Sequence, residues 1–405
     1  MFFLNKIFRR YSFKDIAITI IKYIIGYPVL ALSYIVPRDK SKWVFGNKLG
    51  FTDNGKYLYI YMLENTGEKA IWISSDRKLV RSLRRLGLPS YYKYSYLGLY
   101  HLLTAYYYVC TIVTRHICYW TSGGSYKVNL WHGVGLKAMG NGAGDLKDFS
   151  FLSKIMMPYA YEKYNIFLTS SKMNAKLISE AFKLSPDVVY DGLYPRCSFI
   201  MQDKGYVESF VGKYESDYTK EIIVKSKSYQ RVYIYMPTWR LKYGSEFLKF
   251  ALPDLKVLNE SLESNNSLLL LKLHPSMKYN NNNMGQLGNI IYLSPEMDVY
   301  PILPFSDVLI TDYSSIYYDY LLMKGKGCIV YDFDYEDYIK EEYNFYYDFN
   351  TYTPGRHCKD FDDLLWLISN NEDCSVDKRE WILELMWGDY LHKDNQQLID
   401  KCHEK

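Results

Sequence analysis

Short apolar runs recur along the chain, and longer mixed stretches separate them. The runs are rich in Val, Ile, Leu and Tyr, and most are continuous rather than alternating. Continuous apolar runs with helices between them are typical of parallel strands buried on both faces. The predicted strands of the first half are 42–46, 70–76, 116–124, 126–133, 165–171 and 187–192. Those of the second half are 232–240, 268–275, 289–295, 307–315 and 327–333.

Two such series predict an α/β protein with two doubly wound, Rossmann-like domains. The charged segment 199–228 lacks a strand pattern and is interpreted as the break between them. The predicted organisation is an N-terminal segment (1–40), an N-terminal domain (41–205), a C-terminal domain (206–375) and a helical tail (376–405). An asparagine-rich stretch, 279–289, is predicted to be a surface loop.

The N-terminal segment is basic and aromatic at its start and almost wholly apolar from Ile16 to Val36. That length suffices for a membrane-spanning helix, but Lys22, Gly26 and Pro28 interrupt it. Basic and aromatic residues before an interrupted apolar helix favour a helix that lies at the membrane surface. A true span and a helix packed into the body stay as alternatives. No small-residue cleavage site follows, so we expect a peripheral or monotopic protein on the cytoplasmic face of the cell membrane.

Composition excludes some classes of protein. Of the 405 residues, 48% are hydrophobic and 23% are charged, which permits sizeable cores. The formal net charge of +4 is small, and no basic block interleaved with aromatics occurs, so no nucleic-acid partner is expected. Seven scattered cysteines form neither a CxxC pair nor a Cys/His metal spacing, which indicates reduced thiols and predicts no metal site.

Unusual polar residues follow the predicted strands, at the carboxyl end of each. They are His132, Arg196, Thr238, Arg240, His274, Asp312, Ser314 and Ser315. In open α/β sheets, ligands bind outside that edge. Because these residues occur in both strand series, they predict a cleft between two domains.

The segment ITDYSSIYYDYLLM ends a predicted buried strand at Thr311, and an apolar helix begins after Ser314 and Ser315. Hydroxyls together with free backbone N–H groups at a helix start form an anion site. The alternative is that one of the two serines merely caps the helix.

Three further residues carry candidate chemistry, each with a plainer alternative. Arg240 in MPTWR can grip a phosphate with two parallel hydrogen bonds, or form a surface ion pair. His274 in LKLHP can donate to a phosphate oxygen or assist a leaving group, or simply end a strand. His132 in NLWHGVG can take the proton of an attacking hydroxyl beside glycines that allow close approach, or be a structural histidine. GVGLKAMG is no P-loop and GAGDLKD no dinucleotide fingerprint, so no cofactor is expected.

Six motifs, in order along the chain, resemble those of the CDP-glycerol glycerophosphotransferase family, the teichoic-acid primases and polymerases. They cover roughly Lys42 to Leu367 and are LWHGVGLKAMG, YPR, MPTWR, LKLHP, DVLITDYSSIYYDYLLM and IVYDFDYEDYIKEEYNFYYDF. The stretch GFTDNGKYLYIYML (Gly50 to Leu63) also resembles the opening of family members that act in capsule or wall glycan synthesis.

The resemblance implies a GT-B-like architecture, with two Rossmann-like domains facing across a cleft. It implies transfer of a polyol phosphate from CDP-glycerol, or a relative such as CDP-ribitol, to a hydroxyl of a lipid-linked glycan or teichoic-acid-like acceptor. CMP is the by-product. Positioning and charge stabilisation supply most of the catalysis in such a step, so we expect no metal. The N-terminal segment would bring the protein to its acceptor at the membrane surface.

Residue roles are carried over from the family motifs. His132 is the implied base for the acceptor hydroxyl, and His274 would bind the donor pyrophosphate and assist the departure of CMP. The implied donor-binding residues are Arg240, Thr238, Thr311, Asp312, Ser314, Ser315 and Asp319. The implied anion or acceptor contacts are Gly133, Lys137 and Arg196.

Two departures from the family pattern affect this assignment. Gly135 stands where the family often has Pro, and GLYPRCS replaces GYPRND, with Ser198 in place of Asp. Two rival interpretations stay open: a glycosyltransferase of the same fold that uses a nucleotide sugar, and a non-catalytic, membrane-bound glycan-binding protein. The presence of both His132 and His274 favours an enzyme.

Overall fold

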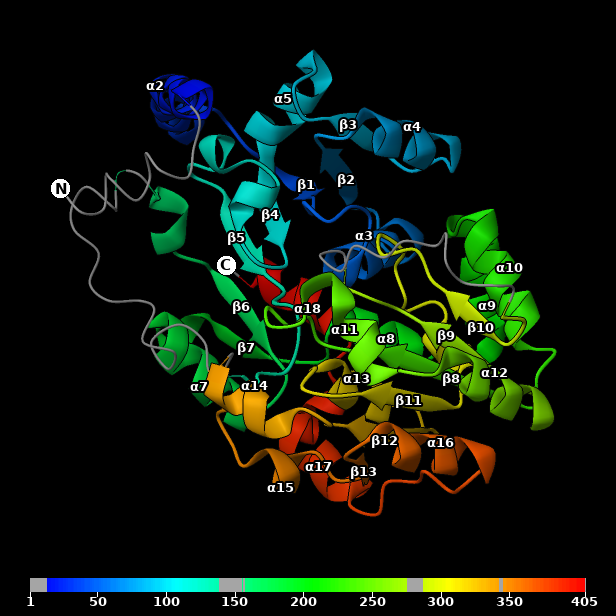
Figure 1. Ribbon diagram of the computed structural model, residues 1–405. Coiled ribbons are helices and arrows are strands. Elements are labelled where there is room, and N and C mark those ends of the chain that lie inside the picture. Colours follow the sequence, from blue (N-terminus) through cyan, green and yellow to red (C-terminus); the bar gives the residue numbers. More distant parts are fainter. Residues whose placement is uncertain (1–12, 138–154, 156, 275–286, 342–344, 405) are drawn as a thin grey trace. The chain divides into compact units, whose positions relative to one another are not determined.

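The structure is a computed structural model that describes residues 13–137, 155, 157–274, 287–341 and 345–404 (Figure 1). Most of the predicted asparagine-rich loop and the basic start of the chain lie outside these residues. The chain folds into two compact units. Unit 1 comprises Met1–Phe51, Tyr59–Leu130 and Phe151–Ile166, and unit 2 comprises Thr52–Leu58, Trp131–Ser150 and Phe167–Lys405. The domain boundaries given above follow the strand series instead, and they stay a prediction.

The first sheet has seven strands in the order β3-β2-β1-β4-β5-β6-β7. They are β1 (Asp39–Phe45), β2 (Lys69–Ser74), β3 (Ser90–Tyr92), β4 (Ala105–Cys110), β5 (Tyr126–Asn129), β6 (Ile166–Thr169) and β7 (Val189–Asp191). Their described pairings are parallel, with Val44 opposite both Ile71 on β2 and Tyr108 on β4. The strand order therefore reverses between β1 and β4, as it does in a doubly wound fold.

The second sheet has six strands in the order β10-β9-β8-β11-β12-β13. They are β8 (Arg231–Met236), β9 (Ser267–Leu271), β10 (Ile290–Tyr292), β11 (Val308–Thr311), β12 (Gly327–Tyr331) and β13 (Arg356–Cys358). Every residue of β9, β11 and β12 is buried, which explains why these strands are continuous apolar runs. The pairings are parallel, and the order reverses between β8 and β11. The predicted α/β class with two parallel sheets is confirmed.

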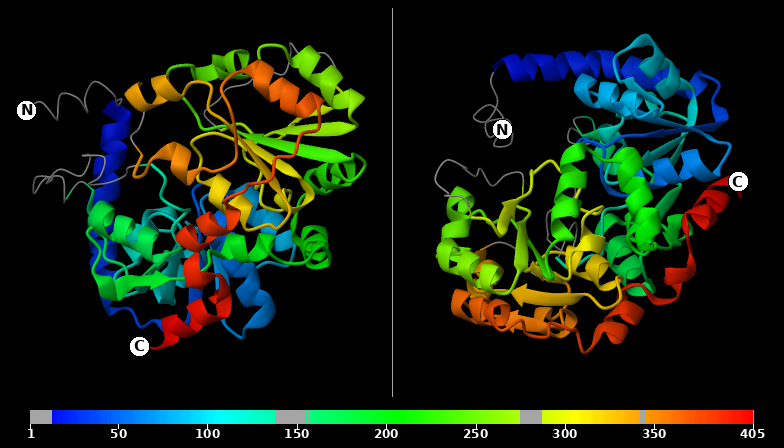
Figure 2. Two further views of the ribbon diagram at one scale, coloured as in Figure 1. Left: turned by 90° about the horizontal axis from the view of Figure 1, so that it is seen from below. Right: turned by 90° about the vertical axis from the view of Figure 1, so that its right-hand side faces the viewer.

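Helices connect the strands, and several begin where a side-chain oxygen accepts a backbone N–H, as Ser171 does from Asn174. Those before β8 are α2 (Phe13–Ile35), α3 (Asp53–Asn65), α4 (Arg77–Arg85), α5 (Tyr96–Thr104), α7 (Lys172–Phe182), α8 (Pro195–Ile200), α9 (Lys204–Tyr214) and α10 (Asp217–Ser226). Those after it are α11 (Phe247–Ala251), α12 (Leu255–Ser264), α13 (Ile316–Leu321), α14 (Tyr335–Glu341), α15 (Phe349–Tyr352), α16 (Phe361–Ser369), α17 (Arg379–Met386) and α18 (Asn395–His403). Next to the second sheet, helix α12 packs against strand β9 and against helix α16 (Figure 2).

One predicted strand is wrong: the run 116–124 forms parts of two short 3₁₀ helices, η1 (Thr114–His116) and η2 (Tyr119–Thr121). Ile117 and Cys118 between them are buried, so the run is apolar because it fills the core rather than because it pairs. The unpredicted strand β4 follows α5 without a turn, and one apolar stretch covers both elements. The segment 199–228 lacks a strand, as expected, and contains α9 and α10.

Helix α2 packs one face against the rest of unit 1 and exposes an apolar stripe on another. A Cβ atom added at Gly26 would lie 2.4 Å from the ring of Trp120, so the two groups are in close contact. Ile21, Ile25 and Leu32 are 54%, 59% and 48% exposed. Among the helices in the described part of the chain, none is both long and apolar enough to cross a bilayer. Association of this segment with a membrane surface stays a prediction.

Candidate functional site

Asp312 lies at the carboxyl end of β11, where the second sheet reverses its strand order. Its carboxylate accepts two hydrogen bonds from the backbone N–H of Thr238, at 2.9 and 3.0 Å. It also accepts one from Nη1 of Arg240 at 2.6 Å. Thr238 and Arg240 follow the neighbouring strand β8, so residues predicted from two distant motifs lie in direct contact. Asp312 is almost fully buried, and its role in the structure is to shape the loop after β8.

Arg240 is buried between two carboxylates. In addition to its contact with Asp312, Arg240 donates from Nε and Nη2 to the two carboxylate oxygens of Asp334, each at 2.9 Å. The guanidinium lies 4.8 Å from the ring centre of Tyr313. Burial alone would lower the pKa of Arg240, but Asp312 and Asp334 outweigh it and raise the pKa. A donor phosphate would have to compete with two carboxylates for this side chain, so its placement fits a positioning role better than direct phosphate contact.

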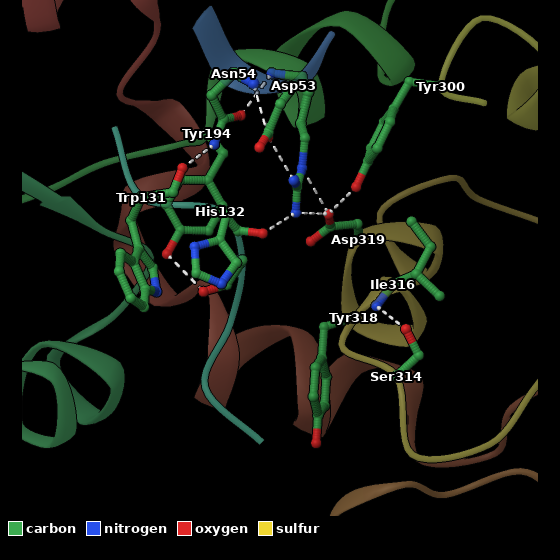
Figure 3. A network of polar contacts seen from close by, with 12 residues as sticks. Asp53, Asn54, Trp131, His132, Tyr194, Tyr300, Ser314, Ile316, Tyr318 and Asp319 are labelled. Atoms are coloured by element: carbon green, nitrogen blue, oxygen red, sulfur yellow. Dashed lines mark hydrogen bonds and ion pairs between the residues drawn. The ribbon is translucent and has the colours of Figure 1, made fainter. Parts of the chain in front are cut away.

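The candidate hydroxyls differ in what they contact. Thr311 donates to the carbonyl of Met236 at 2.8 Å and is fully buried, so its proton is already used within the sheet. Ser314 and Ser315 are half-buried and precede α13. The backbone N–H of Ile316 donates weakly to Ser314 Oγ at 3.5 Å (Figure 3). Ser315 makes no side-chain cap bond. Helix capping therefore does not consume the Ser315 hydroxyl.

The turn at His132 lies directly against the loop that carries Ser314 and Ser315, here called the serine loop. Trp131 has φ = +51° and Gly133 has φ = +148°, so the main chain is in the left-handed region on both sides of His132. A Cβ atom added at Gly133 would lie 3.0 Å from Ser315 Oγ and 3.1 Å from Nη2 of Arg196. Only glycine permits this approach, which brings the candidate base and a candidate phosphate contact to neighbouring positions.

Arg196 connects the His132 turn to buried carboxylates. Its Nη2 donates to the carbonyl oxygen of His132 at 2.8 Å. Nε and Nη2 donate to Asp319 Oδ2 at 3.0 and 2.7 Å, and Nη1 donates to Asp53 Oδ1 at 2.7 Å. Tyr300 donates its hydroxyl to the same Asp319 oxygen at 2.6 Å (Figure 3). Arg196 and Asp319, both predicted site residues, thus form a buried pair that positions the main chain of His132.

Asp53 and Asn54 at the start of α3 complete this network. Neither was predicted from the sequence as a site residue. Asn54 donates from Nδ2 to the carbonyl of Trp131 at 2.8 Å, and its Oδ1 accepts the backbone N–H of Arg196 at 3.2 Å. Asp53, which bonds Arg196, has φ = +65°. The local signal in the sequence is the Asp-Asn pair within GFTDNGKYLYIYML, because Asp and Asn adopt the left-handed conformation more readily than most residues.

His274 follows β9 and is exposed. Its ring centre lies 6.4 Å from that of Trp239, in the loop after β8. Partial burial, and then the positive charges of Lys272 and Lys137, hold the pKa of His274 below its usual value. Lys137 places its Nζ 5.5 Å from the ring centre of Tyr338 and forms an isolated antiparallel bridge with Phe345. The two predicted residues His274 and Lys137 are therefore close enough to influence each other's charge.

The predicted residues fall into two layers. A buried layer consists of paired charges and a sheet hydroxyl: Arg196, Asp319, Arg240, Asp312 and Thr311. A more accessible layer consists of His132, Lys137, Thr238, His274, Ser314 and Ser315. In the described residues, no group of three His, Cys, Asp or Glu side chains could hold a metal ion. The roles predicted for these residues in binding and catalysis stay predictions.

Residues 29–387 match the family model for CDP-glycerol:poly(glycerophosphate) glycerophosphotransferase. The chain is 30% identical over 255 residues to the teichoic acid ribitol-phosphate polymerase TarK of Staphylococcus aureus, which covers 62% of this chain and 47% of TarK. It is 24% identical over 386 residues to the teichoic acid ribitol-phosphate primase of Bacillus spizizenii, covering 91% and 92% of the two chains. The chain spans less than half the length of TarK and of the similar polymerase TarL.

Solved structures of the wall teichoic acid polymerase TagF share the fold. One matches with a TM-score of 0.71 and 20% identity, covering 97% of each chain. A TagF variant soaked with CDPG matches with a TM-score of 0.71 and 18% identity, over 97% of this chain and 96% of that one. At this identity the similarity establishes the architecture alone.

Proposed function

The chain belongs to the CDP-glycerol:poly(glycerophosphate) glycerophosphotransferase family. We propose that it transfers a polyol phosphate from a CDP-activated donor, with glycerol phosphate as the favoured group. The acceptor in this proposal is a hydroxyl of a lipid-linked, teichoic-acid-like glycan, and CMP is released. One observation carries the proposal beyond family membership. The His132 turn touches the serine loop at Gly133, so a base and a phosphate contact can act on the same phosphorus.

In the proposed reaction, the acceptor oxygen attacks the phosphorus that carries the glycerol. The new P–O bond forms as the bond to the CMP oxygen breaks, and His132 takes the proton of the acceptor hydroxyl. CMP leaves as the phosphate monoester opposite the attacking oxygen. Most of the rate enhancement then comes from holding the two reactants in line and from stabilising charge on the phosphoryl oxygens.

The accessible layer supplies the groups that would contact the donor. The buried Oγ1 of Thr238 has no hydrogen-bond partner within the described residues, so it is available to donate to a phosphate oxygen. Ser315 lies beside Gly133 and contributes a second hydroxyl. His274, with its lowered pKa, is neutral near pH 7 and still donates one N–H to a pyrophosphate oxygen. Lys137 adds positive charge to balance the anionic donor.

The exposed apolar stripe of α2 supports association with a membrane surface, and the proposal places the protein at the cytoplasmic face of the cell membrane. In this proposal the stripe lies in the headgroup region without crossing the bilayer. A lipid-linked acceptor is confined to the same surface, so peripheral binding raises its local concentration at the enzyme.

The test is CMP release from CDP-glycerol and CDP-ribitol by the full chain, with a membrane-lipid acceptor fraction. We expect acceptor-dependent release that His132→Ala and His274→Ala each abolish. Lys220→Ala, at a partly exposed lysine on α10, should leave the release unchanged. Turnover of a nucleotide sugar with neither CDP-polyol consumed would identify a glycosyltransferase instead. Acceptor binding without turnover of any donor would identify a glycan-binding protein.

A further inference from the structure

Both sheets reverse their strand order between the first and fourth of their strands in chain order, and the proposed donor site uses only the reversal point of the second sheet. In the first sheet the order reverses between β1 and β4, and ligands of doubly wound sheets bind outside the strand ends at such points. Phe45 lies opposite Val109 in the parallel register. Two residues further on, Asn47 leaves β1 and Thr111 leaves β4, so these side chains follow adjacent strands at the reversal.

Both residues carry a buried polar atom that makes no hydrogen bond to any described residue: Nδ2 of Asn47 and Oγ1 of Thr111. Asn47 is 5% exposed and Thr111 is 2% exposed. Oδ1 of Asn47 accepts the N–H of Leu49 at 3.0 Å, which fixes the amide orientation and leaves Nδ2 as a donor. Nδ1 of His116 is a third such atom. The Asn47 amide and the Thr111 hydroxyl can both donate, and buried donors without partners cost free energy, so these two at one sheet edge indicate a ligand that accepts hydrogen bonds.

Three cations act on His116, close to the same edge. A Cβ atom added at Gly46 would lie 3.4 Å from Cγ1 of Ile117, which brings the loop after β1 against His116. Burial, and then the charges of Lys48, Arg115 and Lys93, lower the pKa of His116, so all three cations are close enough to act on its charge. None of the three forms an ion pair within the residues that the structure describes. Asp76, the carboxylate that follows β2, accepts the N–H of Lys78 at 2.7 Å and caps α4, so it is not an ion-pair partner of these cations.

The apolar stripe of α2 lies near this cluster. Lys22 on α2 is close enough to Lys93 to lower the pKa of that lysine, after the larger effect of burial and that of Arg115. The exposed Ile21 and Ile25 flank Lys22 in sequence. A ligand with phosphate next to a lipid would therefore meet cations and apolar surface together.

We infer that Asn47, Thr111 and His116, with Lys48, Lys93 and Arg115, form a phosphate-binding site at the carboxyl edge of β1 and β4. Resting on the proposed function, the inference assigns this site to the phosphate at the lipid end of the acceptor, separate from the donor site of the second sheet. Amide and hydroxyl donors with three cations match the several acceptor oxygens and negative charge of a phosphate.

The experiment measures the dissociation constant of inorganic pyrophosphate for the full chain by titration calorimetry. Arg115→Gln should weaken one class of pyrophosphate site about tenfold, and the nearly isosteric Thr111→Val should weaken the same class several-fold. Two control variants should leave the pyrophosphate affinity of that class of site unchanged. They are Ser315→Ala, in the serine loop, and Lys220→Gln, on α10. Thermal melting verifies folding, and if Arg115→Gln does not fold, Thr111→Val carries the test.

Two further arms separate the sources of phosphate. Flotation on vesicles of phosphatidylglycerol and of phosphatidylcholine measures general attraction to headgroups. If Arg115→Gln and Thr111→Val reduce vesicle binding but not pyrophosphate affinity, the inference is overturned. Unchanged pyrophosphate affinity in both variants overturns it as well. In the CMP-release assay, Arg115→Gln should raise the KM for the acceptor about tenfold with the KM for the donor unchanged. The calorimetric result stands even if no CMP is released, so the two proposals fail separately.

Discussion

Arg196 donates a hydrogen bond from Nη2 to the carbonyl oxygen of His132 at 2.8 Å, across 64 positions of the chain. The same guanidinium is held by Asp319 and Asp53, so its orientation is fixed on two sides. The main chain of the candidate base is thus held by a buried cation that the substrate need not touch. This arrangement makes Arg196 a positioning residue.

Replacement of Arg196 by Lys should separate positioning from donor binding. Lysine keeps the positive charge but cannot bond three partners in one plane, so the His132 turn loses its fixed position. We expect kcat to fall about 100-fold while the KM for the CDP-polyol stays unchanged. Initial rates of CMP release measure both constants. Arg231→Lys, at a surface arginine bound to the carbonyls of Asn371 and Glu372, is the matched control. A raised donor KM with normal kcat would instead assign Arg196 to donor contact.

Gly133→Ala should abolish most activity. The new Cβ would lie 3.0 Å from Ser315 Oγ and 3.1 Å from Nη2 of Arg196, at a φ of +148° that alanine rarely adopts. The turn must move away from the serine loop, and the reactants lose their alignment. Gly212→Ala in α9 is the control, because nothing lies within 4 Å of its added Cβ and alanine should stabilise the helix by about 0.5–1 kcal/mol. CMP release and urea unfolding compare the two variants, and an active Gly133→Ala enzyme would refute the close contact.

The family predicted from six short motifs is confirmed, and so are the two parallel sheets. The family followed from the resemblance of the motifs. The two sheets followed from local pattern, because a parallel strand covered on two faces is a continuous apolar run. The same reasoning placed Arg240 and Asp312 at one sheet edge, and they are in fact in contact at 2.6 Å.

The ion pairs that fix the site could not be predicted in this way. Asp53 and Arg196 are 143 positions apart, and neither has a local signal that names its partner. Burial of Arg240 between Asp312 and Asp334 likewise depends on tertiary packing. The MPTWR motif alone is equally compatible with an arginine that binds phosphate. Strand β4 was missed because α5 runs into it without a polar break.

Lys56 should be a major determinant of stability in unit 2. Its buried ammonium lies 2.5 Å from Glu215 Oε1 and 2.8 Å from Asp298 Oδ2. Lys56→Met leaves both buried carboxylates without an ion-pair partner among the described residues, and we expect it to lower the free energy of unfolding by about 3–5 kcal/mol. Urea unfolding measures the change. Lys249→Met, at an exposed lysine paired with Glu246, should change it by less than about 1 kcal/mol. Equal effects of the two substitutions would contradict the buried arrangement.

Two threonines at the second sheet's reversal should respond differently to loss of their hydroxyls. Thr238 Oγ1 makes no bond to the described residues, so Thr238→Val should raise the KM for the donor about tenfold without loss of stability. Thr311 donates to Met236 O at 2.8 Å, so Thr311→Val should cost about 1 kcal/mol of stability and leave the donor KM unchanged. Donor titrations and thermal unfolding of both variants distinguish the roles. The reverse pattern would move the donor contact from Thr238 to Thr311.

The pH dependence of the reaction should report on the lysines around His274. Burial, Lys272 and Lys137 lower the pKa of His274, so it becomes protonated only at pH values below its usual range. Lys137→Gln removes one positive charge, which stabilises the protonated imidazole and raises this pKa. If catalysis needs neutral His274, the acidic limb of kcat/KM therefore moves to higher pH in Lys137→Gln. NMR titration of the His274 ring verifies the assignment directly. Lys242→Gln, at an exposed lysine paired with Asp337, should shift neither curve. A ring titration that moves while the acidic limb does not would show that His274 holds the donor in either protonation state.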